Sequence, residues 1–282
     1  MTTATAGVLR VLSPRDLDSV MQVLAKNPIA HCFVASRVRG SGLDPWRLGG
    51  ELWGWSEDGE LSSLLYLGAN LVPVETTPAA RTAFAERLRR IGRRCSSIVG
   101  PADDVNELWP LIADSWGPTR EVRAVQPLLV MDGDSAIIPD YSVRQVHESE
   151  IDILVPACVA MFTEEVGVSP TSGGGGDAYR ARILELIRMG RAYARIDNGK
   201  VIFKAEIGAI GDGVCQVQGV WVAPEFRGLG LGVPGMSSVV ALARRQAAPV
   251  VSLYVNDYNT AARRLYERVG FRDAGTLTTI LF

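Results

Sequence analysis

The sequence predicts two consecutive α/β domains, and three observations support this. The chain has 282 residues, more than the roughly 100–200 of a typical single domain. Residues 132–140 are acidic and turn-rich and end near a proline, as in a linker. The order of strand and helix signals before this stretch is repeated after it. We therefore expect domains at residues 1–131 and 141–282, joined by the linker 132–140.

Composition and charge exclude several classes of partner. The chain is 47% hydrophobic and 21% charged, with a formal net charge of -2, so nothing favours binding to nucleic acid or to an anionic membrane. No apolar run approaches the ~20 residues needed to span a bilayer. Residues 1–7 lack the basic and apolar regions of a secretory signal. We expect a cytoplasmic protein, whose oligomeric state the sequence does not indicate.

The cysteines and histidines do not suggest a metal site. The four cysteines form no Cys-x-x-Cys pair and lie among apolar neighbours, which is typical of free buried thiols. The only two histidines, His31 and His147, lie in different halves. We therefore expect no metal and no Ser-His-Asp triad.

In the first half, a strand at residues 8–12 precedes a helix capped near Ser13 or Asp16. Two strand signals then flank a turn, and Thr77-Pro78 supplies the cap and first residue of a helix. The later elements are a strand, a helix and a closing strand. The expected ranges are strands at 50–55, 62–67, 96–99 and 122–131 and a helix at 105–112.

The second half repeats this order. A strand at 141–146 precedes a helix that begins near Ser149, and Asn198-Gly199 forms a hairpin signal between two alternating runs. The other expected ranges are strands at 192–196, 201–207, 216–222, 250–255 and 276–282 and helices at 179–189, 234–246 and 259–269. Leu265-Tyr266 stands where the first half has Leu108-Trp109. The shared order indicates an internal duplication.

The main functional motif is a glycine loop between a strand and a helix. Residues 216–222 form a β-branched strand, a turn follows, and Arg227-Gly228-Leu229-Gly230-Leu231-Gly232 leads into the next helix. Unpaired N–H groups and the positive end of the helix dipole attract an anion at such a position. The loop is therefore predicted to bind a pyrophosphate.

Two other glycine-loop families do not fit. A dinucleotide-binding fold needs Gly-x-Gly-x-x-Gly early in a βαβ unit, whereas this loop has the spacing Gly-x-Gly-x-Gly late in the chain. A Walker loop needs Gly-Lys followed by Ser or Thr, which is absent here.

The pattern Arg-x-x-Gly-x-Gly, preceded by Val-x-Val-x-Pro-Glu, resembles the acetyl-CoA motif of the GNAT superfamily of N-acyltransferases. Residues 254–271, with Asn259, Ala262, Leu265-Tyr266 and Gly270-Phe271, resemble that family's next helix. The resemblance covers residues 141–282 well and residues 1–131 only in element order. It implies two tandem GNAT-like domains, each with a mixed, mostly antiparallel sheet flanked by helices, and acetyl-CoA as acyl donor without a metal.

The resemblance also implies roles for residues around the cofactor. Val220, Trp221 and Val222 would pair with the pantetheine arm. The pyrophosphate would be held by Arg227, Gly228, Leu229, Gly230, Leu231, Gly232 and Val233. Asn259 would bind near the pantetheine, or serve only as a helix N-cap. Tyr266 would protonate the leaving thiolate, or be only a core residue. Val233 offers no polar side chain to a phosphate, and Pro234 removes one potential N–H donor. The pyrophosphate would therefore be held mainly by backbone N–H groups and by Arg227.

Carboxylates are the candidates for the base and for binding of the acceptor. By the same resemblance, Glu206 would take the proton of the amine through water, although a solvent-facing strand glutamate is the alternative. Glu164 and Glu165 would line the acceptor side, or be ordinary charges at a helix end. The glycine run at residues 171–177 is either a mobile lid or a flexible connector.

The resulting hypothesis is direct transfer of acetyl from acetyl-CoA to a small-molecule or peptide amine. A non-catalytic acyl-CoA sensor or scaffold is the alternative, and a longer acyl donor stays open. Residues 71–77 of the first half contain no glycine. We therefore expect the first domain to be a degenerate copy without a cofactor, which braces the second domain or shapes its acceptor cleft.

Overall fold

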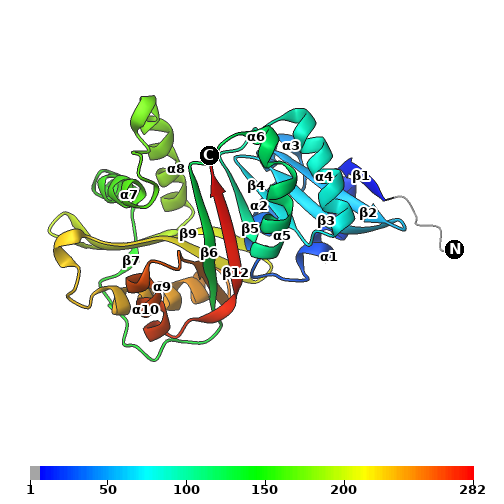
Figure 1. Ribbon diagram of the computed structural model, residues 1–282. Helices are drawn as coiled ribbons and strands as arrows, with labels where there is room; N and C mark the ends of the chain where they lie inside the picture. The colour runs from blue at the N-terminus through cyan, green and yellow to red at the C-terminus, as the bar shows by residue number, and fades with distance from the viewer. Residues whose placement is uncertain (1–6) are drawn as a thin grey trace. The chain divides into compact units, whose positions relative to one another are not determined.

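The computed structural model describes residues 7–282, which fold into two compact units (Figure 1). Unit 1 contains the chain up to Leu128, together with Tyr254–Tyr258 and Asp273–Phe282. Unit 2 contains Leu129–Leu253 and Asn259–Arg272. The expected boundaries at 131 and 141 stay a prediction; the contact-based units differ from them chiefly in assigning the last ten residues to unit 1.

The elements of the first half follow the expected order, with one strand, β4, and three short helices, α2, α3 and α6, that the sequence did not predict. The strands are β1 (Val8–Val11), β2 (Glu51–Glu57), β3 (Glu60–Leu67), β4 (Asn70–Val74), β5 (Ser97–Pro101) and β6 (Glu121–Met131). The helices are α1 (Leu17–Leu24), α2 (Cys32–Ser41), α3 (Pro45–Leu48), α4 (Pro78–Ile91), α5 (Ala102–Leu108) and α6 (Ala113–Trp116).

The elements of the second half also agree with expectation. The strands are β7 (Arg144–Gln145), β8 (Ala192–Asp197), β9 (Lys200–Gly211), β10 (Val214–Val222), β11 (Val250–Tyr254) and β12 (Arg272–Leu281). The helices are α7 (Ile151–Val166), α8 (Gly176–Arg188), α9 (Gly232–Gln246) and α10 (Thr260–Val269). The first strand is shorter than predicted, and the glycine run at 171–177 already contains the start of α8.

Both units contain a mixed, mostly antiparallel sheet, which confirms the predicted fold class. In unit 1 the strands are ordered β1-β2-β3-β4-β5-β12, and in unit 2 β11-β10-β9-β8-β7. Within these two orders, β4 with β5 and β10 with β11 are parallel, and the other neighbouring strands are antiparallel. In unit 1, β12 pairs with β5 from Leu277 opposite Pro101 to Leu281 opposite Ser97.

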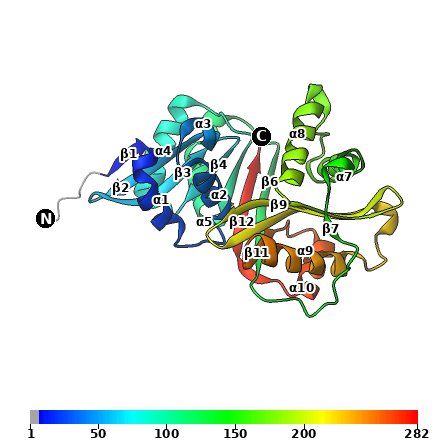
Figure 2. The same cartoon turned by 180° about the vertical axis from the view of Figure 1, so that it is seen from behind.

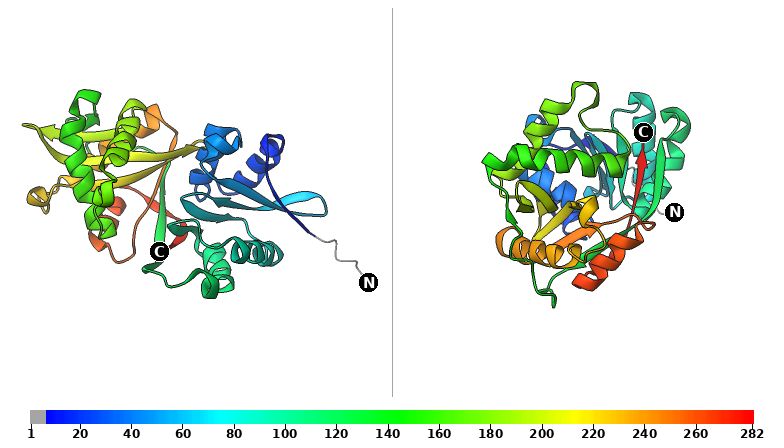
Figure 3. Two further views of the ribbon diagram at one scale, coloured as in Figure 1. Left: turned by 90° about the horizontal axis from the view of Figure 1, so that it is seen from above. Right: turned by 90° about the vertical axis from the view of Figure 1, so that its left-hand side faces the viewer.

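Helices cover both faces of each sheet. Figures 1 and 2 show α7 and α8 on one side of the unit 2 strands and α9 and α10 on the other. In unit 1, α1 and α2 lie on one face and α4 and α5 on the opposite face (Figure 3). The side chains of β3 alternate accordingly, since Leu64 and Tyr66 pack with α1 and α2 whereas Leu65 and Leu67 pack with α4.

The two halves share small details as well as element order. In β2–β3, Trp55 pairs with Ser63 and a register shift follows; in β8–β9, Arg195 pairs with Phe203 and the same shift follows. A constant offset of 140 therefore relates the two hairpins, since 55 + 140 = 195 and 63 + 140 = 203.

The first helices also begin alike. The guanidinium of Arg10 donates to Asp16, whose carboxylate accepts from the Ser13 N–H at 2.8 Å. In the second half Arg144 donates to Glu150, which accepts from the His147 N–H at 2.9 Å. The spacings are the same in both halves, which supports the predicted duplication.

The stretch 132–140 is attached to unit 2 by hydrogen bonds although it forms neither helix nor strand. The hydroxyls of Ser237 and Ser238 on α9 donate to the carbonyls of Ile137 and Asp140 at 2.8 and 2.7 Å. Arg272 pairs with Asp132. The segment is therefore fixed along its length.

Two further expectations concern cysteines and membranes. Cys32, Cys95, Cys158 and Cys215 are all free and buried, as predicted. In the part of the chain that the structure describes, no helix is both long and apolar enough to cross a membrane. Residues 1–6, on which the expected lack of a secretory signal partly rests, lie outside the described residues.

Candidate functional site

The glycine loop lies between the end of β10 and the N-terminus of α9. A short 3₁₀ turn, Pro224–Phe226, carries the chain out of the strand. Gly228 and Gly230 have φ angles of 76° and 78°, a left-handed conformation that glycine adopts without a steric penalty. Within the described residues, no N–H group of residues 228–233 donates to a backbone carbonyl. These donors and the positive end of a 15-residue helix form an anion-binding geometry.

Two other glycines of this region allow close packing. A Cβ at Gly232 would lie 2.6 Å from Leu265 Cδ1, and a Cβ at Gly235 would lie 2.9 Å from Phe203 Cδ2. Separations this short are steric clashes, so larger residues would push α9 away from α10 or from β9. Glycine thus fixes the position of the helix whose N-terminus carries the loop.

The strand before the loop leaves its parallel neighbour early. β10 pairs with β11 only from Val214 opposite Val250 to Gln216 opposite Ser252, although β10 continues to Val222. The edge of Val220, Trp221 and Val222 that faces away from β9 therefore lies beyond this pairing. Unpaired backbone groups at such an edge can bind another extended chain.

Arg227 and Glu164 contact each other. The Arg227 Nη2 atom lies 2.7 Å from Glu164 Oε2, and Arg227 Nε donates to the Val222 carbonyl at 3.0 Å. The indole N–H of Trp221 reaches the same carboxylate at 3.4 Å. Both charged side chains are about half exposed. The arginine expected to bind phosphate thus binds a carboxylate of its own chain in this structure.

Tyr266 is buried on α10, where its ring packs edge-on against Phe271 with centroids 5.8 Å apart. Burial raises the pKa of the Tyr266 hydroxyl, and the negative charge of Glu165 raises it further. The phenol is therefore neutral at physiological pH and can donate a proton. Glu165, at the end of α7, is the acidic group near this phenol.

Asn259 is the N-cap of α10. Its side-chain oxygen accepts from the Ala262 N–H at 3.1 Å, which confirms the capping role. The side-chain NH₂ group points to no partner among the hydrogen bonds of the described residues and can donate to a ligand.

Glu206 lies in the interior of unit 2. It is only 8% exposed, on a strand with neighbours on both sides, so the alternative of a solvent-facing strand glutamate is wrong. Gln218 Nε2 donates to Glu206 Oε1 at 2.8 Å, and Lys204 Nζ lies 3.6 Å from Glu206 Oε2.

The sequence did not single out Lys204. Its side chain is 2% exposed, which is rare for lysine unless it is paired. The signal in the sequence was the spacing of two residues from Glu206, which puts both on one face of an apolar strand.

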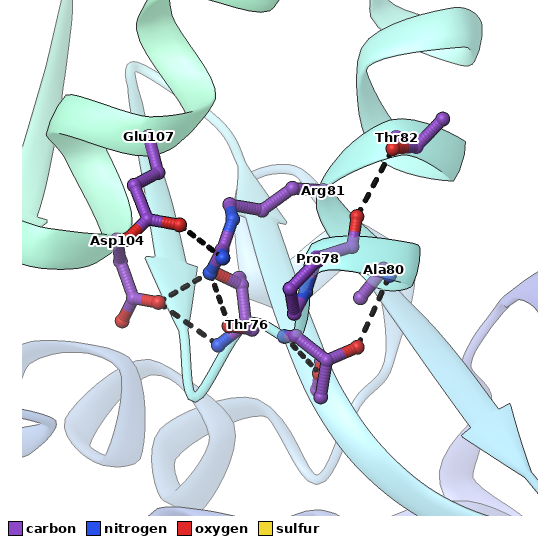
Figure 4. A network of polar contacts seen from close by, with 9 residues as sticks. Thr76, Pro78, Ala80, Arg81, Thr82, Asp104 and Glu107 are labelled. Carbon is purple, nitrogen blue, oxygen red and sulfur yellow. Dashed lines mark hydrogen bonds and ion pairs between the residues drawn. The ribbon is translucent and has the colours of Figure 1, made fainter.

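The position in unit 1 that corresponds to the glycine loop is closed by internal contacts (Figure 4). The Asp104 carboxylate accepts from the Thr76 N–H at 2.9 Å and from the Thr76 hydroxyl. Arg81 on α4 donates to Thr76 and pairs with Glu107. The Thr77 hydroxyl caps the helix by accepting from the Ala80 N–H at 3.2 Å.

Two different family models match separate parts of the chain. Residues 173–271 match the acetyltransferase (GNAT) family. Residues 50–154 match a domain of unknown function, DUF4081. The family assigned to the second half therefore spans the glycine loop, α10 and Glu206.

Solved structures resemble the whole chain. A Drosophila protein aligns with a TM-score of 0.68 at 14% identity, covering 98% of this chain and 99% of its own. A GCN5-related N-acetyltransferase from Sphaerobacter thermophilus aligns at 0.61 and 15%, covering 97% and 95%. A tandem GNAT protein from the clavulanic acid biosynthesis pathway aligns at 0.53 and 15%, covering 97% and 98%. At identities this low, the similarity shows the fold alone, and this fold is that of a tandem GNAT protein.

Proposed function

Since the second half of the chain carries a GNAT-family acetyltransferase domain, we propose that this protein transfers acetyl from acetyl-CoA to an amine and that only residues 141–282 are catalytic. The observation that carries the proposal is the loop at 228–233, whose N–H groups have no backbone acceptor at the start of α9. In this proposal residues 1–131 form a degenerate copy that binds no acyl-CoA.

The cofactor would lie along the end of β10. Residues 228–233 would hold the pyrophosphate through their N–H groups, assisted by Arg227. The edge of Val220, Trp221 and Val222 that lies beyond the β11 pairing would bind the pantetheine arm and its thioester in the manner of an added strand. Asn259 would contribute its NH₂ group while its oxygen continues to cap α10.

The reaction would proceed by direct attack. The amine nitrogen bonds to the thioester carbonyl carbon, and the carbon–sulfur bond then breaks. Tyr266 donates its proton to the departing thiolate. The extra proton of the amine passes to Glu206, directly or through water. No covalent bond to the enzyme forms, which agrees with four buried cysteines.

The acceptor amine would be attracted by the acidic end of α7. Glu165 is the closer of the two candidates to the reaction, because its charge acts on Tyr266. Glu164 would contribute once Arg227 turns to the pyrophosphate. The acceptor is therefore an amine that arrives as the cation and loses one proton to solvent before it attacks, and it is borne by a small molecule or a peptide.

A binding experiment combined with a transfer assay tests the proposal. Titration calorimetry should show one acetyl-CoA per chain, and thiol release from acetyl-CoA should rise with at least one amine of a broad panel. Absence of acetyl-CoA binding would refute the proposal. Binding without turnover on any amine, and without thioester hydrolysis, would instead establish the acyl-CoA sensor. Replacing acetyl-CoA with longer acyl-CoA donors tests the acyl chain length.

A further inference from the structure

A β-bulge interrupts the end of β10. Gln218 pairs with Glu206 and Trp221 pairs with Lys204, so that Gly219 and Val220 on β10 face Ala205 alone on β9. Two residues opposite one is the definition of a bulge, which redirects the backbone locally. Gly219 adopts a φ of +61°, the left-handed conformation that such a bulge needs at its first residue. The bulge lies within the strand end expected to meet the cofactor.

The ammonium of Lys204 holds this bulge from the side of α7. Lys204 Nζ donates to the Gly219 carbonyl at 2.9 Å and lies 3.6 Å from Glu206 Oε2. The Cys158 thiol of α7 lies near the same group. Burying an ammonium is costly unless its hydrogen-bonding groups are satisfied. The bulge carbonyl, at 2.9 Å, is the short hydrogen-bond acceptor of this ammonium, and the Glu206 carboxylate balances its charge.

The corresponding residues of unit 1 show that the fold itself needs no ammonium here. By the offset of 140 between the hairpins, Leu64 corresponds to Lys204 and Tyr66 to Glu206. Leu64 is fully buried among apolar side chains. Its strand pairs with β4 from Leu64–Val74 to Leu67–Leu71 without any register shift. The buried lysine and the bulge thus occur together in unit 2 and are both missing from unit 1.

The geometry of a peptide unit connects Lys204 to the reaction. In a trans peptide the carbonyl and the N–H point in opposite directions, and the described residues contain no cis peptide. The carbonyl of Gly219 and the N–H of Val220 belong to one such unit. When Lys204 binds the carbonyl, it therefore aims the Val220 N–H away from itself. A hydrogen bond from an ammonium also polarises the peptide and strengthens its N–H as a donor.

We propose that Lys204 is a positioning residue of the acetyltransferase site: by holding the bulge carbonyl of Gly219, it aims the Val220 N–H at the carbonyl oxygen of the bound acyl thioester. This rests on the proposed function. The N–H then stabilises negative charge that develops on that oxygen during attack by the amine, and a donor prearranged in this way is a strong contribution to catalysis.

The test replaces Lys204 with leucine, the residue that unit 1 has at this position. The matched control is Lys200→Met, because Lys200 lies on the same strand but is exposed and pairs with Glu225. Acetyl-CoA labelled with ¹³C at the acetyl carbonyl is bound to each protein, and its carbonyl band is recorded by infrared difference spectroscopy. A hydrogen bond to the carbonyl lowers the frequency of this band. We expect the lowered band in the wild type and in Lys200→Met, and a band near its solution position in Lys204→Leu.

Kinetics provide the second measurement. Lys204→Leu should lower kcat by about 10–100-fold, since losing a prearranged donor costs up to 10²–10³, and should leave the Kd of CoA within about threefold, because the pyrophosphate loop is separate. A merely structural role would change the CoA affinity and the stability together. An unchanged band together with an unchanged kcat would overturn the proposal.

A second variant tests the proposal even if Lys204→Leu does not fold. A Cβ at Gly219 would lie 3.0 Å from Lys204 Nζ, so Gly219→Ala disturbs the same contact from the other strand. We expect the same loss of the lowered band with CoA binding kept, and a wild-type band in this variant would overturn the proposal. The infrared readout needs no acceptor. A wild type that binds acetyl-CoA with a lowered band but acetylates no amine would refute the proposed function and leave only the contact between the Val220 N–H and the acyl carbonyl.

Discussion

The N-termini of α4 and α9 occupy the same place in the two halves, after the fourth strand of each, yet their donors have different partners. Before α4, the Thr76 N–H donates to the Asp104 carboxylate, and Thr77 caps the helix. Before α9, residues 228–233 have no such partner within the described chain. The N-terminus of α4 is thus satisfied by a carboxylate of the protein itself. The N–H groups before α9 have no such partner among the described residues and can donate to an anionic ligand.

The neighbouring strands differ in the same sense. β4 contains Pro73 and runs in regular register with β3, whereas β10 contains Gly219 and a bulge. A proline removes a donor, and a regular register leaves no peptide redirected. The two units thus keep one fold while the helix end and the neighbouring strand differ, and the proposed function assigns the ligand site to unit 2 alone.

Closing the loop in unit 2 should have the largest effect. In Gly230→Val a β-branched side chain would have to adopt φ near +78°, which is strongly disfavoured. The loop would adopt another conformation, in which its N–H groups no longer point at one anion. The Kd of acetyl-CoA should therefore rise about 100-fold or more, which is a loss of about 2.7 kcal/mol of binding free energy. The control is Gly49→Ala in unit 1, where φ is +70° and the added Cβ meets open space. Equal binding by Gly230→Val and the wild type, measured by calorimetry, would disprove the role of the loop.

Removal of the Tyr266 hydroxyl should mainly affect the chemical step. In Tyr266→Phe, kcat should fall by about 10²-fold, as expected for loss of a general acid, with little change in CoA affinity. In the first half the aligned residue Trp109 only packs against Phe282, with ring centroids 5.7 Å apart. A kcat equal to that of the wild type would reduce Tyr266 to the same packing role.

The pH profile gives a second check on Tyr266. Its raised pKa means that the phenol stays protonated above the ordinary tyrosine range. An acid catalyst loses activity as the pH rises through its pKa, so the alkaline limb due to Tyr266 should lie above pH ~10. An alkaline limb that disappears in Tyr266→Phe yet lies well below pH ~10 would contradict the raised pKa.

Opening the closed helix end of unit 1 should cost stability without creating a site. Asp104→Ala leaves the Thr76 N–H and hydroxyl without their acceptor, at a cost of about 1–3 kcal/mol. The Tm should fall by several degrees in differential scanning calorimetry, while the number of acetyl-CoA bound stays at one. A second bound acetyl-CoA would mean that Asp104 alone closes this position.

Breaking the contact of Glu164 with Arg227 should have a smaller effect. In Glu164→Gln the carboxylate that pairs with Arg227 at 2.7 Å is gone, and an exposed ion pair is worth about 0–1 kcal/mol. The arginine becomes free to bind phosphate, so CoA should bind up to about fivefold more tightly. Weaker CoA binding in this variant would show that Glu164 instead supports the loop.

The smallest effect concerns a feature that both halves share. Hydrogen bonding to Arg144 lowers the pKa of Glu150 to about 2. A lowered pKa stabilises the fold above the unfolded pKa of about 4.5, and this contribution is lost as the pH falls from there toward 2. Glu150→Gln should lower the Tm by about 1–3 °C at pH 7, and this difference should shrink below pH 4.5 and vanish once the pH has fallen through 2. A Tm difference independent of pH would contradict this origin.

Local patterns in the sequence predicted much of the fold. Asn198-Gly199 marks its hairpin, and Thr77-Pro78 marks the start of α4. The helix α2 was missed because its sequence, from Cys32 to Ser41, ends in Arg-Gly-Ser and has no clear apolar stripe. The pairing of β12 with β5 joins residues about 180 positions apart, and no local signal encodes it.

Predictions of the site had similar limits. The glycine loop could be found because its residue types are local and follow a strand. The burial of Lys204 could not, because it depends on where α7 packs and on a bulge in a neighbouring strand. Whether Glu206 faces solvent likewise depended on the position of its strand within the sheet. When the role of a single residue depends on packing between distant parts of the chain, the local sequence does not predict that role.

The pairing of β12 with β5 also affects how the chain matures. A ribosome releases the polypeptide from its N-terminus, and such domains generally fold in that order. Here the strand opposite residues 97–101 is made of residues 277–281, which emerge only after all of unit 2. Unit 1 must therefore wait with an unfinished edge until residues 277–281 have been synthesised, and a premature stop before residue 277 would damage the half that was translated first.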